Sequence, residues 1–294
     1  MKRKFSDSRP TRNDRRPSSN DRIPARRDRG PVPNDRGGNR DSGHHERPSN
    51  HATIFGVLPV LEALRANARR IEKIVVAEGV REKRLQEIFD TARASGVRVD
   101  RVSRESLERM VDRSANHQGV IAFAASADYV SVDDILDSAQ SAPLIVILDG
   151  VEDPRNLGAV LRSAECAGAD GVVIPDRRAA GLTDTVAKSS AGAIEYVKVA
   201  KTTNLNRLIE NLKERNIWVV GTSGDASTNY ADWDWTSPCA LVMGAEGSGL
   251  HRLVAENCDV LVKIPMYGKI DSLNVSVAAG VILFEARRQR SQKR

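Results

Sequence analysis

The stretch Leu144-Ile145-Val146-Ile147-Leu148 is a continuous apolar run, and the polar loop 149–154 follows it directly. An unbroken apolar strand is typical of a parallel sheet that helices cover on both faces, because neither face meets water. Further strands are expected at 171–174, 194–199, 217–221, 240–243 and 260–264. Helical patterns fall between most of them, at 157–167, 184–190, 205–215 and 250–256, and a last helix is expected at 275–289. This alternation predicts an α/β domain with a mostly parallel sheet over 143–292.

A smaller α/β unit is expected before it, over residues 52–126. A helical pattern runs through Val60–Leu64, apolar residues recur at helix spacing from 85 to 92, and Ser103 is placed to cap a third helix at 105–111. Strands are expected at 74–77, 97–99 and 119–124. The pattern indicates a small three-layer domain, and residues 127–142 are interpreted as a linker helix and loop.

The basic character of the chain lies in its first 50 residues. They hold 14 Lys and Arg against 7 Asp and Glu, so their net charge of +7 exceeds the +6 of the whole chain. Six of the 12 prolines also lie there, and large apolar side chains are almost absent. Such a segment cannot bury enough surface to offset chain entropy, so 1–50 is predicted to be a disordered tail. It could make non-specific phosphate contacts, or it could only solubilise the protein.

Composition excludes several classes of protein. No run of 18 apolar residues predicts a membrane span, and the N-terminus has no apolar segment of the kind that a secretory signal needs. The three cysteines, Cys166, Cys239 and Cys258, are odd in number and share no metal-ligand spacing. We therefore expect a cytoplasmic protein with no membrane partner, no disulfide framework and no metal site.

Ligands of open α/β sheets bind outside the carboxyl ends of the strands, so the segments that follow the strands are the candidates for chemistry. After the first strand, Asn156 can cap the next helix, and Arg162 lies about two turns into it among small and apolar residues. An Arg in that setting needs an anion. A structural salt bridge to Glu165 or Asp149 would satisfy it as well as a ligand.

Two later segments are also rich in small and polar residues. Met243–Leu250 holds three glycines in six residues, which lets a backbone approach a ligand closely. No Lys-Ser/Thr pair follows it, and Glu246 would repel a phosphate, so a ligand with hydroxyl, amine or cationic groups is favoured over a nucleoside triphosphate. In 264–278, Ser272 and Asn274 stand at a helix start, and helix capping accounts for only one of them.

In this order and at these distances, the three segments resemble the three motifs of SPOUT-class RNA methyltransferases, closest to the bacterial 23S rRNA guanosine 2′-O-ribose methyltransferases. The first motif is similar to Asn-Leu-Gly-Ala-Val-Leu-Arg-Ser-Ala at 156–164, and the second to Leu-Val-Met-Gly-Ala-Glu-Gly-Ser-Gly-Leu at 241–250. The third is similar to Ile-Pro-Met at 264–266 with Ser-Leu-Asn-Val-Ser-Val-Ala at 272–278. His117-Gln118-Gly119-Val120 resembles the segment that closes the family's N-terminal domain. The resemblance covers about 52–290 and leaves out the tail.

The resemblance implies a fold that no periodicity argument would suggest. The C-terminal domain would be an α/β trefoil knot formed by about 240–280, although threaded chains are very rare. The knot would hold S-adenosylmethionine, and the matching positions are Gly244, Ile264 and Leu273, with Thr222 near the pocket. The protein would act as a homodimer through its final helix and knot face. The smaller domain would be a ribosomal-protein-like module that binds RNA.

The resemblance also implies the reaction, which is methyl transfer to a ribose 2′-OH of a guanosine in 23S rRNA. The matching polar positions are Asn156, Arg162, Glu246, Ser272 and Asn274. Members of the family are often described with the Arg as activator, but a guanidinium with a pKa above about 12 is a poor base. We expect Arg162 to bind substrate phosphate or developing alkoxide charge, while Glu246, Ser272 and Asn274 orient the ribose and Arg162.

Three other functions fit the sequence less well. A guanosine in the D-loop of tRNA would keep the chemistry and change the substrate, although the N-terminal domain favours ribosomal RNA. A non-catalytic RNA-binding ribosome assembly factor would be expected to lack Arg162, Glu246 or Asn274, and all three are present. A nicotinamide-dependent dehydrogenase lacks its first-strand G-x-G-x-x-G and the acidic partner of that motif.

Overall fold

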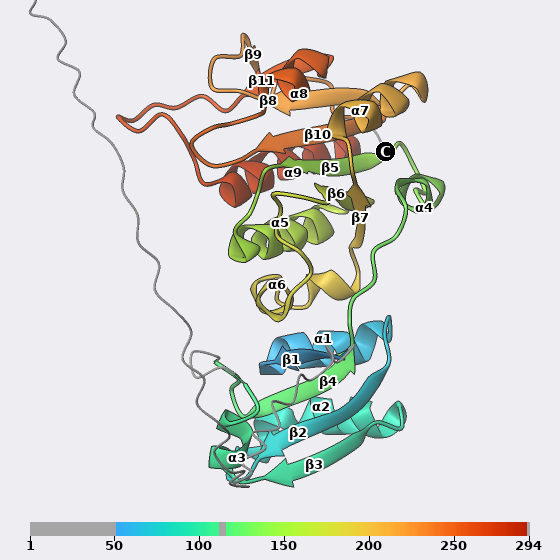
Figure 1. Cartoon of the computed structure of the whole chain (residues 1–294), viewed down its shortest axis with the longest axis vertical. Coiled ribbons are helices and arrows are strands. Elements are labelled where there is room, and N and C mark those ends of the chain that lie inside the picture. The colour runs from blue at the N-terminus through green and yellow to red at the C-terminus, as the bar shows by residue number, and fades with distance from the viewer. Residues whose placement is uncertain (1–50, 112–115, 293–294) are drawn as a thin grey trace, which may run out of the picture. The chain divides into compact units, whose positions relative to one another are not determined.

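In the computed structural model, the described residues are 51–111 and 116–292, and they contain two β-sheets (Figure 1). One sheet has four strands and the other has seven. The expected tail, residues 1–50, lies outside the described residues. No helix within the described ranges is long and apolar enough to cross a membrane.

The four-stranded sheet has the order β1-β4-β2-β3. Its strands are β1 (His51–Phe55), β2 (Ile71–Ala77), β3 (Arg98–Val102) and β4 (Val120–Ala125). β4 pairs antiparallel with β1 and β2, and β3 pairs parallel with β2. Its helices are α1 (Val57–Ala66), α2 (Glu82–Ala94) and α3 (Arg104–Glu108). α1 and α2 share one apolar core with the sheet, and α3 inserts Leu107 into a second core on the other face, so the predicted three layers are confirmed.

The seven-stranded sheet has the order β7-β6-β5-β10-β8-β11-β9, and every neighbouring pair is parallel, as predicted. Its strands are β5 (Leu144–Asp149), β6 (Gly171–Pro175), β7 (Lys198–Thr202), β8 (Trp218–Thr222), β9 (Thr228–Asn229), β10 (Cys239–Gly244) and β11 (Val260–Lys263). β10 lies beside β5 although 89 residues separate their ends, so the loops after these two strands come together.

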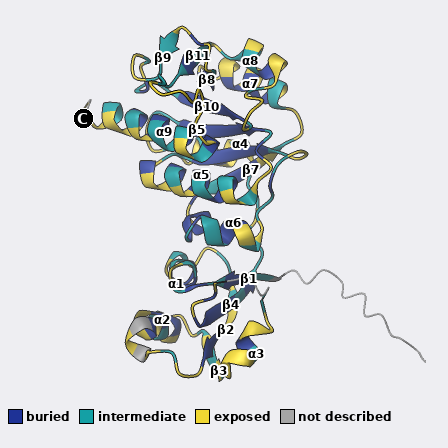
Figure 2. Cartoon of the chain, turned by 90° about the vertical axis from the view of Figure 1, so that its left-hand side faces the viewer, coloured by how far each residue is buried: buried dark blue, intermediate teal, exposed yellow. Residues whose placement is uncertain are grey.

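Helices cover both faces of the large sheet. They are α4 (Val132–Asp137), α5 (Pro154–Ala167), α6 (Asp184–Ser189), α7 (Leu205–Glu214), α8 (Arg252–Asn257) and α9 (Val275–Gln292), with a 3-10 turn, η1, at Ala193–Glu195. Leu144, Val146 and Leu148 pack with α5, α6 and α9, while Ile145 and Ile147 pack with α4, α7 and α8. The unbroken apolar run of β5 is therefore buried on both sides, and Figure 2 shows the strands as the buried layer.

α5 begins earlier than the sequence predicted. Asp153, not Asn156, is its N-cap, because the Asp153 carboxylate accepts the backbone N–H of Arg155 at 2.8 Å and Pro154 occupies the first turn. The helix ends at Gly168, whose φ of 70° suits a residue without Cβ. Capping by Asp153 leaves the amide of Asn156 free for other contacts.

The strand expected at 194–199 is wrong in position. Ala191 and Gly192 have φ angles of 52° and 93°, and this reversal turns 193–195 into η1 before β7 starts at Lys198. The helix expected at 105–111 is shorter than predicted, because α3 ends at Glu108. The sequence analysis also did not predict the edge strands β1 and β9.

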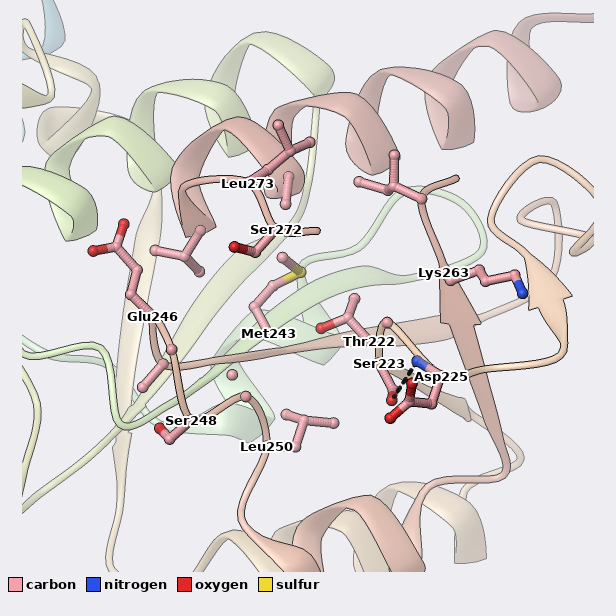
Figure 3. Close-up of a pocket in the computed structure, with 18 of the residues that line it drawn as sticks. Thr222, Ser223, Asp225, Met243, Glu246, Ser248, Leu250, Lys263, Ser272 and Leu273 are labelled. Atoms are coloured by element: carbon pink, nitrogen blue, oxygen red, sulfur yellow. Dashed lines mark hydrogen bonds between the residues drawn. The ribbon is translucent and has the colours of Figure 1, made fainter. Parts of the chain in front are cut away.

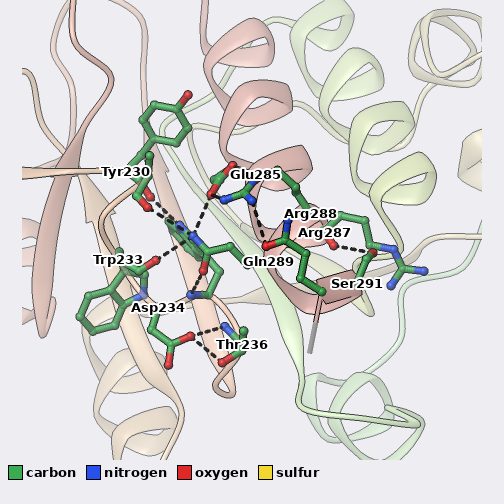
Figure 4. Close-up of polar contacts among 12 residues, drawn as sticks. Tyr230, Trp233, Asp234, Thr236, Glu285, Arg287, Arg288, Gln289 and Ser291 are labelled. Carbon is green, nitrogen blue, oxygen red and sulfur yellow. Dashed lines mark hydrogen bonds and ion pairs between the residues drawn. The ribbon is translucent and has the colours of Figure 1, made fainter. Parts of the chain in front are cut away.

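Polar side chains fasten the far end of α9 to the loop that precedes β10 (Figure 4). The Gln289 amide accepts the backbone N–H of Trp235 at 3.0 Å and donates to the carbonyl oxygen of Trp233 at 3.1 Å. The Arg290 guanidinium donates to four backbone carbonyls, which are those of Ala142, Pro143, Trp235 and Ser237. These bonds fix α9 at its C-terminal end, and α9 also packs along α5.

Candidate active site

The loop after β10 is folded back on itself. Ala245 and Gly249 exchange two backbone hydrogen bonds, at 3.1 and 2.9 Å, and Glu246 lies at the tip between them. Gly244 makes this possible, because a Cβ on it would overlap the backbone of Gly249 and Leu250. The glycines predicted to allow close backbone approach therefore first allow the loop to close on its own strand.

Asp149 ties this loop to the end of β5. Its buried carboxylate accepts the backbone N–H of His251 at 2.7 Å and contacts the His251 Nδ1 at 2.8 Å. Because only four residues separate the end of β5 from the start of α5, the same end of the sheet positions both the first and the second motif segments.

Asn274 joins the polar residues of all three segments. Its Nδ2 donates to Asn156 Oδ1 at 2.9 Å and also to Glu246 Oε1. Its Oδ1 accepts the backbone N–H of Ser276 at 2.9 Å, so the same side chain caps α9. Residues from the start of α5, the β10 loop and the start of α9 thus meet at one amide.

A cavity of about 680 Å³ opens beside this junction (Figure 3). Thr222, Gly244, Ile264 and Leu273, the four residues that the resemblance assigned to the cofactor, all line it. Glu246 and Ser272 line it too, whereas Asn156 and Asn274 are not among its lining residues. Its size falls within the range of small-molecule sites, and its wall combines exposed backbone with apolar side chains.

Several residues of the cavity wall were not predicted from the sequence as site residues. Ser223 and Asp225 follow β8, Lys263 ends β11, and Met243 and Met266 add apolar surface. The signal was available for the first two, because they come directly after a strand of the parallel sheet, where ligands bind. Within the described residues, no three His, Cys, Asp or Glu side chains gather as a metal site would require.

Arg162 stands apart from the junction. It lies six residues after Asn156 on α5, which places it roughly 9 Å farther along the helix axis and about 120° around it. Its side chain is exposed, and among the described residues it forms no hydrogen bond or ion pair. The structure therefore contains neither the contact to Glu246, Ser272 or Asn274 that the sequence predicted nor the alternative salt bridge to Glu165 or Asp149.

Two family models match the chain. The SpoU rRNA Methylase family model matches residues 143–284, and the model for RNA 2'-O ribose methyltransferase substrate binding matches residues 53–130. The two matches fall on the large sheet with its helices and on the small sheet, respectively.

Individual proteins are similar over most of the chain. The 23S rRNA (guanosine-2'-O-)-methyltransferase RlmB of Ralstonia nicotianae is 45% identical over 83% of this chain and 98% of that relative. A Bacillus subtilis protein is 45% identical over 82% of this chain and 97% of its own length, and its name, TrmH family tRNA/rRNA methyltransferase YacO, leaves the RNA open. The crystal structure of the SpoU methyltransferase AviRb from Streptomyces viridochromogenes with AdoMet superposes with a TM-score of 0.68, at 25% identity, over 83% of this chain and 92% of that one.

Proposed function

Because the chain belongs to the SpoU rRNA methylase family, we propose that it transfers a methyl group from S-adenosylmethionine to a guanosine ribose 2′-OH of 23S rRNA. The observation that carries the proposal is the junction at Asn274, which brings polar residues of three distant segments together beside a ligand-sized cavity. Several relatives at 43–45% identity are named for this reaction.

The cavity suits the proposed methyl donor. S-adenosylmethionine, when bound, supplies an electrophilic methyl group on a sulfonium. Gly244 and the backbone of the folded loop would approach it, while Ile264 and Leu273 offer apolar surface for a purine ring. Thr222 would stand at the side, where its hydroxyl already donates to the carbonyl of Val242 at 3.2 Å.

The residues at the junction would position the ribose. In-line transfer needs the 2′-oxygen held at one place, and the hydroxyl proton must leave. The Asn274 amide fixes Asn156 and Glu246 by donating to both, and it occupies only one Glu246 oxygen. The other carboxylate oxygen can then accept a hydrogen bond from a ribose hydroxyl, and Ser272 faces the same cavity.

Arg162 would act as a binding group. Its exposed guanidinium is free to hold a substrate phosphate in two hydrogen bonds or to stabilise alkoxide charge, and a guanidinium is a poor base. We expect Arg162→Lys to lower turnover strongly, because an ammonium cannot reproduce the planar fork. Near-normal turnover of that variant would contradict the bidentate role.

A second copy of the chain would cover the exposed apolar side of α9. Val277 and Phe284, seven residues apart on that helix, are 51% and 52% exposed, and Tyr267 and Ile270 in the preceding loop are 95% and 75% exposed. Apolar side chains so exposed on neighbouring elements mark an interaction surface. Phe284→Arg should turn a dimer into monomers in analytical ultracentrifugation, whereas a wild-type chain that sediments as a monomer would reject this assembly.

The test of the reaction is methyl transfer from radiolabelled S-adenosylmethionine to unmodified total RNA, fractionated by size. Label in 23S RNA that survives alkali as a 2′-O-methyl dinucleotide would support the proposal, and it should be absent with Asn274→Ala. Label in tRNA would support the alternative that the Bacillus relative's name leaves open. An RNA that binds without gaining label would favour a non-catalytic assembly factor. A ribosomal RNA substrate and three free cysteines fit a cytoplasmic site of action.

A further inference from the structure

A second cavity, of about 810 Å³, lies at the start of α5. Four elements or their flanks line it, namely β1, the end of α3, α5 and α6. Its lining includes Phe55, Arg109, Met110, Arg155, Asp184 and Lys188. These residues come from both family-model matches, 53–130 and 143–284, and none of them lines the cofactor cavity.

The walls of this cavity are fastened to one another. Thr53 in β1 donates its backbone N–H to Asp184 of α6 at 3.2 Å. Outside the lining, the Arg69 guanidinium makes two hydrogen bonds, at 3.0 and 2.5 Å, to the Glu195 carboxylate, and these side chains are only 7% and 2% exposed. A desolvated, bidentate ion pair holds the segment before β2 and η1 in one arrangement, and the Thr53–Asp184 bond joins two walls of the cavity directly.

The cavity carries an excess of positive charge. Arg109 and Arg155 are exposed and, among the described residues, form no side-chain hydrogen bond or ion pair. Lys188 stands over the Phe55 ring, 5.0 Å from its centroid. Among the described residues of the lining, Asp184 is the one carboxylate, and it already accepts a hydrogen bond from the backbone. Three cations beside an aromatic ring and the exposed Met110 form a surface for phosphates and an unstacked base.

Arg155 links this cavity to the junction, because the next residue, Asn156, holds Asn274. We propose that the cavity binds the single-stranded RNA segment immediately next to the methylated nucleotide, with its phosphates on Arg155, Lys188 and Arg109. A base of that segment stacks against Phe55 or Met110. This inference rests on the proposed function. It adds that the enzyme recognises its target while the nucleotide next to the methylated one is unstacked and outside any RNA helix.

The test compares Arg155→Ala and Lys188→Ala with Arg207→Ala in the full-length chain. Arg207 is a matched control, because it is also an exposed helical Arg with no side-chain partner among the described residues, but it lies on α7. Binding of an unmodified 23S rRNA transcript is measured over a range of salt concentrations, together with methyl transfer and binding of S-adenosylmethionine. Arg155→Lys and Lys188→Arg keep the charge.

Each cavity variant should weaken RNA binding and raise the KM for RNA about 5- to 10-fold, and each should reduce the slope of log K against log salt by about 0.7. Cofactor affinity and the Arg207→Ala control should match wild type, and the charge-preserving variants should recover most of the binding. Loss of RNA affinity equal to that of the control would overturn the proposal. A wild-type chain that methylates no RNA would instead reject the proposed function.

Discussion

Gly244→Ala is the sharpest perturbation of the proposed cofactor site. A methyl group at residue 244 would overlap the backbone of Gly249 and Leu250, well inside the 3.0 Å that real Cβ atoms keep. Backbone cannot rotate away as a side chain can, so the loop has to retreat by about 1 Å. That retreat would break both hydrogen bonds between Ala245 and Gly249, at about 1 kcal/mol each.

The expected loss of about 2 kcal/mol lowers Tm by roughly 4 to 8 °C for a chain of this size. The loss of function should be larger, because a 1 Å displacement of positioned groups can reduce a rate about 100-fold. Differential scanning fluorimetry gives the Tm, isothermal titration calorimetry gives S-adenosylmethionine affinity, and radiolabel transfer gives the rate.

Gly268→Ala is the control, since a methyl group there meets only one atom, at 4.0 Å, and no positive φ is involved. It should leave Tm, cofactor binding and rate unchanged. If Gly244→Ala bound S-adenosylmethionine as tightly as Gly268→Ala, then the close approach at residue 244 would not shape the cofactor site, and the reasoning would be refuted.

Three further perturbations separate structural from functional roles. Asn274→Asp keeps the acceptor that caps α9 but loses the Nδ2 donor, so the free energy of unfolding should change by no more than about 1 kcal/mol, while methyl transfer should fall at least as far as with Asn274→Ala. Methyl transfer equal to that of the wild type would show that the Asn274 amide has no role in the site. Arg69→Met should lower the free energy of unfolding in urea by about 3 to 5 kcal/mol, because it leaves the Glu195 carboxylate buried without its partner. Adding Glu195→Leu to that variant should recover much of the lost stability. An Arg69→Met variant as stable as wild type would refute this. Burial raises the pKa of the Cys239 thiol to about 11, so only about one Cys239 side chain in a thousand is a thiolate at pH 8. N-ethylmaleimide should therefore label the exposed Cys166 before Cys239. Equal labelling of the two cysteines in mass spectrometry would contradict this order.

The architecture followed from the sequence because burial on both faces leaves a direct pattern. Ile145 and Ile147 enter one core while Leu144, Val146 and Leu148 enter the other, and only a covered parallel strand needs apolar residues at all five positions. The predicted element boundaries were wrong where local backbone geometry decides where a strand begins. The φ angles of Ala191 and Gly192 moved the expected strand, and no apolar pattern encodes them.

The site was predictable as a set of segments but not as a set of contacts. The rule that ligands bind at strand ends selected the three segments, and the resemblance selected residues within them. Asp153 caps α5 instead of Asn156 because of the direction in which the chain enters the helix. That direction cannot be read from the sequence pattern. The direction of Arg162 depends on the helix rotation, and that rotation is set by packing of α5 against α6, where Gly158 lies against Ser189.

A ribosome makes this chain from its N-terminus, so Asn156 is synthesised 134 residues before Arg290. At about 5 to 20 residues per second, this gap lasts roughly 7 to 27 s. Only over the last 40 residues of that gap, after Leu250 has been made, do the first two motif segments both exist, and the helix that begins beside Asn274 then still lacks the Gln289 and Arg290 contacts that fasten its far end. A nascent chain still attached to its ribosome would therefore lack a finished junction, and modification of RNA would wait until translation of α9 is complete.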